Sequence, residues 1–217
     1  MPEIYRISHR RWLAATLAGL VSCVACAMPE ASVPPTERTS AMTCSVDLYG
    51  DSIMHGGYGG NLRLDEPPAA TLKRLRPKYT VRDLSLNGET AGQRARTFES
   101  ERRTGRFVVI EHGINDSIQR LPVEAPLRQM IDIARREGRE VILTGLSRQP
   151  LPIAGRSSAD QTIRHLASAL RVPFADWDAV KYSPNEMADV LHPSKQYSDR
   201  LVRSIVKVLD RLAPECA

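Results

Sequence analysis

Short apolar runs alternate with longer helix-like stretches along most of this chain. Five runs have the apolar or β-branched character of strands, at residues 46–49, 79–84, 107–110, 141–143 and 172–175. The third is apolar at every position, which is typical of a parallel strand buried on both faces. The stretches between and after the runs predict helices within 64–75, starting near Pro67-Pro68, and at 90–103, 123–136, 160–170 and 196–212. This alternation predicts a parallel sheet with helices on both faces.

The N-terminal segment has a different pattern. Arg6, Arg10 and Arg11 precede an apolar run at residues 12–26. The run has no polar face and is shorter than the roughly 20 residues that span a membrane. A basic head followed by such a run predicts a signal peptide at residues 1–27, and therefore an exported protein, in the periplasm or secreted.

Two processing routes fit the end of this segment. Cleavage after Ala27 would release a soluble protein, whereas cleavage before Cys23 would leave a lipidated cysteine as a membrane tether. Residues 28–43 are rich in Pro, Ser and Thr and predict a flexible tether. The remaining residues, 44–217, are expected to form one domain.

Composition excludes several classes of protein. Hydrophobic residues make up 42% of the 217 residues, which is too many for a disordered chain. The net charge of +5 is spread along the sequence, without a basic stripe interleaved with aromatics. We therefore expect no nucleic-acid partner. We expect a monomer.

Polar and glycine-bearing segments follow the predicted strands. Gly50-Asp51-Ser52 follows the first strand, residues 87–90 the second and residues 113–116 the third, and residues 189–192 precede the last helix. Since the carboxyl ends of parallel strands meet at one edge of a sheet, these segments are expected to line one crevice.

These segments, taken in their order along the chain, resemble the motifs of the SGNH (GDSL-like) hydrolase superfamily. They read Gly-Asp-Ser at 50–52, Gly88, Gly-x-Asn-Asp at 113–116 and Asp-x-x-His at 189–192. The resemblance covers about residues 46–212. It implies a three-layer α/β/α sandwich with a five-stranded parallel sheet, flavodoxin-like in topology, and serine esterase activity.

Chemistry and resemblance together suggest a role for each candidate residue. Ser52 would be the nucleophile and His192 its base, because a serine hydroxyl needs a neighbouring base at neutral pH. Asp189 would orient the imidazole. The resemblance assigns the oxyanion hole to the backbone N–H groups of Ser52 and Gly88 and to the side-chain amide of Asn115. As alternatives, each of these residues could instead be a helix cap or a turn residue.

Other polar residues are given structural roles or rejected. Asp51 and Asp116 are expected to shape loops through hydrogen bonds to backbone N–H groups. Asp176 and Asp178 are rival acids, but they lack the spacing that Asp189 has to His192. No histidine has partners at ligand spacing, so no metal site is expected, and the proposed chemistry needs no cofactor.

Two cysteines remain once Cys23 and Cys26 are assigned to the signal. Cys44 precedes the first strand, and Cys216 follows the last helix, which should run antiparallel to the strands. Both would lie at the end of the sheet away from the crevice. We therefore expect a Cys44–Cys216 disulfide, as in exported proteins.

The substrate is only broadly constrained by sequence. Export, together with a glycine-rich segment at 56–60 that we interpret as a flexible lip, favours an O-acetyl or acyl ester of an envelope polysaccharide or lipid. Lysophospholipase or thioesterase activity, transfer to a sugar hydroxyl, and a non-catalytic carbohydrate-binding module remain as alternatives.

Overall fold

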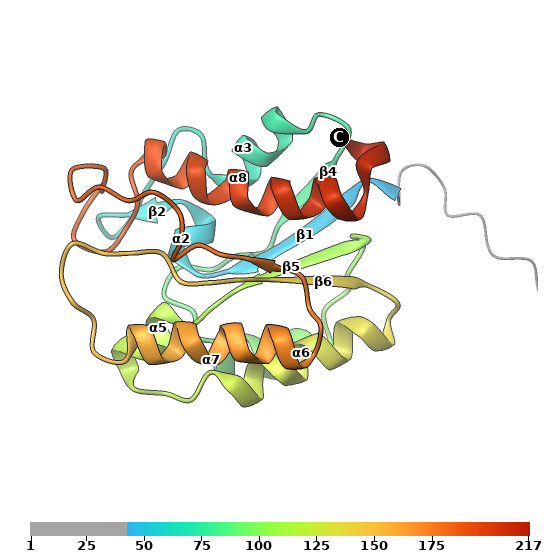
Figure 1. Ribbon diagram of the computed structural model, residues 1–217, viewed down its shortest axis with the longest axis horizontal. Helices are drawn as coiled ribbons and strands as arrows, with labels where there is room; N and C mark the ends of the chain where they lie inside the picture. The colour runs from blue at the N-terminus through green and yellow to red at the C-terminus, as the bar shows by residue number, and fades with distance from the viewer. Residues whose placement is uncertain (1–42) are drawn as a thin grey trace, which may run out of the picture. The chain divides into compact units, whose positions relative to one another are not determined.

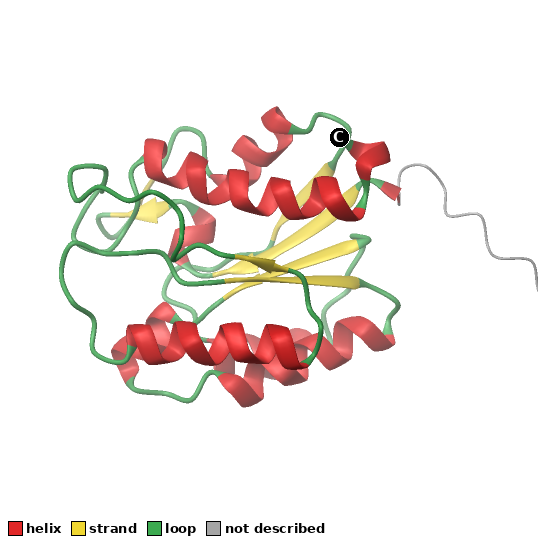
Figure 2. Ribbon diagram, viewed as in Figure 1, coloured by secondary structure: helices red, strands yellow, loops and turns green. Residues whose placement is uncertain are grey.

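A five-stranded sheet forms the centre of the protein. The computed structural model describes residues 43–217. All neighbouring strands of the sheet are parallel, in the order β4-β1-β5-β6-β7 (Figures 1 and 2). The strands are β1 (Ser45–Gly50), β4 (Thr80–Asp83), β5 (Phe107–Glu111), β6 (Glu140–Thr144) and β7 (Phe174–Ala175). The predicted five-stranded parallel sheet is confirmed.

Helices cover both faces of this sheet. On one side lie α3 (Pro68–Leu75) and α8 (Lys195–Leu212) (Figure 1). On the other side lie α4 (Ala91–Phe98), α6 (Glu124–Arg136) and α7 (Arg156–Ala169). The predicted three-layer α/β/α architecture is therefore confirmed.

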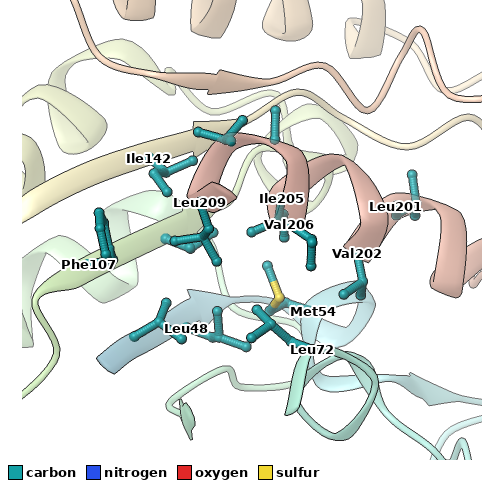
Figure 3. Close-up of a cluster of buried hydrophobic side chains, with 14 of the residues drawn as sticks. Leu48, Met54, Leu72, Phe107, Ile142, Leu201, Val202, Ile205, Val206 and Leu209 are labelled. Carbon is teal, nitrogen blue, oxygen red and sulfur yellow. The ribbon is translucent and has the colours of Figure 1, made fainter. Parts of the chain in front are cut away.

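The two hydrophobic layers follow from the alternation of side chains along the strands. Phe107 and Val109 of β5 pack into the layer under α8, whereas Val108 and Ile110 pack into the opposite layer. Figure 3 shows the first layer, where Ile205 and Leu209 of α8 lie over the sheet. Fully burying one such side chain contributes roughly 1.5–3 kcal/mol.

The strand order creates a switch point beside β1. The chain passes from β1 through α3 to β4 at one edge, then returns through α4 to β5 on the other side of β1. The connection after β1 therefore leads toward one edge of the sheet, and the connection after β5 leads toward the opposite edge. In open α/β sheets, ligands bind at the carboxyl ends of strands at such a point.

Several short elements were not predicted. They are α2 (Ser52–His55), the antiparallel hairpin β2 (Gly57–Tyr58) with β3 (Leu62–Arg63), α5 (Ile114–Gln119) and a terminal 3-10 turn, Pro214–Cys216. All are shorter than the windows over which hydrophobic periodicity can be recognised.

Two predicted helix boundaries were wrong. The helix predicted at 90–103 ends at Phe98. The buried guanidinium of Arg103 reaches back to the Phe98 carbonyl and to Glu137, so the chain has turned by this point. Conversely, α7 begins before residue 160, at Arg156, after Gly155 adopts a left-handed conformation with φ of 80°.

The ends of the domain are joined as predicted. Cys44 and Cys216 form a disulfide with their Cα atoms 5.6 Å apart. Cys44 directly precedes β1, so the bridge lies at the amino end of the strands. The predicted signal peptide at 1–27 and the tether at 28–43, except Thr43, lie outside the described residues. Within residues 43–217, no helix is long and apolar enough to cross a membrane.

Candidate active site

Ser52 is the first residue of α2, at the carboxyl end of β1. Asp51 caps this helix, because its Oδ1 accepts a hydrogen bond of 2.9 Å from the Ile53 N–H. Gly50 makes the turn possible, since a Cβ there would lie 2.5 Å from the Met54 Cβ and 2.7 Å from Glu111 Oε2. The local sequence Gly-Asp-Ser thus fixes the direction of the Ser52 side chain.

Three side chains from two distant segments meet in a hydrogen-bonded row. Ser52 Oγ lies 2.8 Å from His192 Nε2. The other ring nitrogen, Nδ1, lies 2.8 Å from Asp189 Oδ2 and 2.9 Å from Oδ1. Asp189 and His192 come from the loop before α8. The structure therefore brings Ser52, His192 and Asp189 together in the order in which a serine, its base and an orienting acid would act.

The Asp189 carboxylate is held by backbone groups as well as by the imidazole. Oδ1 accepts from the N–H of Leu191 at 2.8 Å and of His192 at 2.7 Å, and Oδ2 accepts from the Gly59 N–H at 2.9 Å. Burial alone would raise the pKa of Asp189, but these donors and His192 outweigh it and hold the pKa below its ordinary value. The carboxylate is therefore ionised wherever His192 can act as a base.

A small cavity opens in front of Ser52. Its volume is about 220 Å³, and its lining includes Ser52, Gly88, Asn115 and His192. Gly88 has φ of 75°, a conformation that favours glycine, and a Cβ there would meet no heavy atom within 4 Å. All of the predicted site residues except Asp189, which lies behind His192, thus border one space.

The amide of Asn115 already has acceptors. Its Nδ2 lies 3.1 Å from Asp51 Oδ2 and 3.2 Å from the Glu89 carbonyl oxygen. Donation to an oxyanion would therefore replace one of these bonds, and the longer one, to Glu89, is the weaker. Asp51 would remain to hold the amide in place.

Two buried acids, Glu111 and Asp51, lie behind Asn115 and the turn before Ser52. The sequence did not predict this pair. Glu111 ends β5 and is fully buried, and its Oε2 accepts from the Asp51 N–H at 3.2 Å. Burial raises the pKa of Asp51 to about 6, and burial together with the nearby Asp51 raises that of Glu111 well above its ordinary value. The detectable signal was a charged residue at the end of an otherwise apolar strand.

The other polar residues near the site have structural partners. Asp116 accepts from the Ala91 N–H, and His112 is buried against Glu89. The rival acids are engaged elsewhere, Asp176 by Arg164 and Asp178 by Arg156. Within residues 43–217, no three or more His, Cys, Asp or Glu side chains gather in a way that could hold a metal ion.

The glycine-rich segment lies beside the cavity, where we predicted a lip, and its flexibility stays a prediction. It forms the β2–β3 hairpin, and Gly59 at its turn donates to Asp189. Gly57, Tyr58 and Gly60 line the cavity. The segment therefore lies at the edge of the cavity. Its strand pairing and its hydrogen bond to Asp189 make it part of the framework of the site.

Comparison with known proteins agrees with the observed fold and with the resemblance to GDSL-like hydrolases. The GDSL-like Lipase/Acylhydrolase family matches residues 48–199, and the chain belongs to this family. No curated protein sequence matches significantly.

Solved structures of this type resemble the chain at low sequence identity. The crystal structure of TesA has 23% identity and a TM-score of 0.67, covering 77% of this chain and 99% of that one. The psychrotrophic esterase EstA from Pseudoalteromonas sp., inhibited by monoethylphosphonate, has 18% identity and a TM-score of 0.64, covering 77% and 97%. A lipase/acylhydrolase from Enterococcus faecalis has 20% identity and a TM-score of 0.65, covering 78% and 96%. At these identities the likeness concerns the fold.

Proposed function

We propose that this protein is an exported serine esterase that hydrolyses short-chain carboxylic esters through an acyl-serine intermediate. The observation that carries the proposal is the row from Ser52 Oγ through His192 to Asp189, with both contacts at 2.8 Å. Membership of an acylhydrolase family supports the same chemistry.

The geometry suggests the following steps. Ser52 Oγ attacks the acyl carbon while His192 Nε2 takes its proton, and Asp189 stabilises the imidazolium through Nδ1. The oxyanion would accept from the N–H groups of Ser52 and Gly88 and from Asn115. The imidazolium then protonates the leaving alcohol. Water, deprotonated by the same imidazole, attacks the acyl-serine and releases the acid.

The size of the cavity favours a short acyl group. Its volume of about 220 Å³ is below the roughly 300–1,000 Å³ of pockets that enclose drug-sized ligands. Tyr58 and Leu191 border this space and limit its extension. An acetyl ester fits, with the alcohol part outside the cavity.

Export is part of the proposal. The Cys44–Cys216 disulfide is expected in an oxidising compartment such as the periplasm or the exterior of the cell. Such a location favours an O-acetylated envelope polysaccharide as substrate, and the mature protein would be either soluble or tethered through lipidated Cys23.

A chain-length series of nitrophenyl esters tests the proposal. The acetyl ester should be hydrolysed with a kcat/KM at least 10-fold above that of the octanoyl ester. Ser52→Ala should remain folded and lose at least about 1,000-fold in kcat. Full activity in Ser52→Ala would show that the nucleophile is misassigned, and a preference for octanoate would contradict the short-acyl assignment.

A further inference from the structure

A second cavity lies away from Ser52, between α8 and the chain that follows β7. Its volume is about 480 Å³, and Phe174, Ala179 and Val208 contribute apolar lining. Cations from both walls line it as well: Lys181 on one side, and Arg203, Lys207 and Arg211 of α8 on the other. We call this feature the basic groove.

Four cations of the basic groove form no close ion pair within residues 43–217. Among residues 43–217, none of Lys181, Arg203, Lys207 and Arg211 has a carboxylate within ion-pair distance, and all four are exposed. Asp176 also lines the groove, and both it and Glu186 are engaged by other arginines. Glu186 forms an ion pair with Arg200, and Asp176 forms a bidentate ion pair with Arg164.

Three of these cations form a row of like charges on α8. Arg203, Lys207 and Arg211 follow one another at intervals of four residues, so their charges lie on one face of the helix. Like charges at this spacing destabilise a helix by a few tenths of a kcal/mol per pair. A row of like charges that borders a concave surface favours binding of a ligand of opposite charge.

The shape and lining of the groove distinguish between anionic partners. A membrane surface would meet a flat or convex face, ideally with apolar side chains to insert. Six large hydrophobic side chains are exposed in residues 43–217, and none of them lines the groove: Leu62, Leu86, Ile118, Leu121, Leu151 and Val190. Arg203 and Arg211 are eight positions apart on α8, or about 12 Å at 1.5 Å per residue. An extended polymer with a negative charge on successive units fits such a groove.

We propose that the basic groove binds an anionic polysaccharide chain bearing carboxylate groups. Lys181 belongs to the connection between β7 and α8, which also carries Asp189 and His192. A chain held in the groove is thus bound by the same connection that supplies the acid and the base. The link to catalysis rests on the proposed esterase function, whereas binding by the groove does not.

Binding is measured in the inactive Ser52→Ala protein, so that no ester is consumed. Polygalacturonate serves as the probe, and uncharged dextran as the polymer control, in calorimetric titrations at low salt. The triple variant Arg203→Glu, Lys207→Glu, Arg211→Glu should weaken polygalacturonate binding at least 10-fold. The matched variant Arg96→Glu, Arg102→Glu, Arg171→Glu changes the net charge equally at exposed positions outside the groove and should stay within about threefold.

Folding and catalysis are checked separately in protein that keeps Ser52. The groove variant should keep its kcat/KM for nitrophenyl acetate and its melting temperature, and its KM for acetylated polygalacturonate should rise at least fivefold with kcat unchanged. Equal weakening by both triple variants, or no binding of polygalacturonate, would overturn the proposal. So would tighter binding of anionic phospholipid vesicles through the same three residues. Loss of esterase activity alone would count against the proposed function and not against the groove.

Discussion

At the scale of single residues, the buried acids Glu111 and Asp51 link the turn at residues 50–52 to Asn115. The side chain of Glu111 accepts from the Asp51 N–H, and the side chain of Asp51 in turn accepts from Asn115 Nδ2. Both acids are fully buried. Because a buried carboxylate is costly, the folded state holds protons here that the unfolded chain releases.

This proton uptake predicts a pH-dependent stability. The pKa of Glu111 lies well above its ordinary value in the folded protein, so the native state binds more protons than the unfolded chain over that window. Its stability therefore falls as the pH rises, by at most about 1.4 kcal/mol per unit for one group. Glu111→Gln removes the ionisable group and with it this fall in stability at higher pH. Urea unfolding between pH 4.5 and 8 should show the variant gaining stability relative to wild type as the pH increases.

Glu124→Gln is the matched control, because Glu124 is exposed on α6. The gain of stability with pH should be larger for Glu111→Gln than for Glu124→Gln, because Glu111 is fully buried. A difference for Glu111→Gln that is constant across the range would mean that Glu111 ionises as it does in the unfolded chain.

At the scale of elements, the β2–β3 hairpin braces the loop that carries Asp189 and His192. Gly59 contacts Asp189 across 130 residues of sequence, through a backbone N–H. A carboxylate with fewer fixed donors would orient the imidazole of His192 less firmly.

Replacing Gly59 by proline tests this brace, since proline has no N–H to donate. Gly59→Pro should lower kcat for nitrophenyl acetate about 10-fold, in the range typical of lost supporting contacts. Gly60→Pro is the control, because Gly60 also has positive φ but does not contact Asp189. Equal losses in the two variants would show that hairpin strain, and not the Asp189 bond, accounts for the effect.

The same elements show what the sequence could and could not predict. The segments at 50–52, 87–90 and 113–116 could be placed together because each follows a recognisable strand of a parallel sheet. The Gly59 contact could not be predicted, since a backbone donor has no residue-specific signal. The pairing of Glu111 with Asp51 was missed because it depends on which strand lies beside β1.

At the scale of the whole molecule, the disulfide and the site lie at opposite ends of the sheet. Cys44 precedes β1 and Ser52 follows it. The bridge joins residues 172 positions apart, and in the chain-entropy model closing so long a loop contributes about 5 kcal/mol as an upper value.

Removing the bridge should separate stability from activity. The variant Cys44→Ala, Cys216→Ala should melt about 5–15 °C lower, at roughly 2–4 °C per kcal/mol for a domain of this size. Its kcat/KM at 25 °C should stay within about twofold of wild type. The site lies at the carboxyl ends of the strands, whereas the bridge lies at their amino ends. An unchanged melting temperature, or a loss of activity in protein that is still folded, would contradict this account.

Covalent labelling shows whether Ser52 is a nucleophile activated by His192. A fluorophosphonate should add once to the folded protein, with loss of fluoride, and peptide mapping should find the adduct on Ser52. His192→Gln should slow labelling at least 100-fold while the fold is retained, since the base is gone. Labelling at another residue, or labelling of Ser52 at an unchanged rate in His192→Gln, would contradict the account.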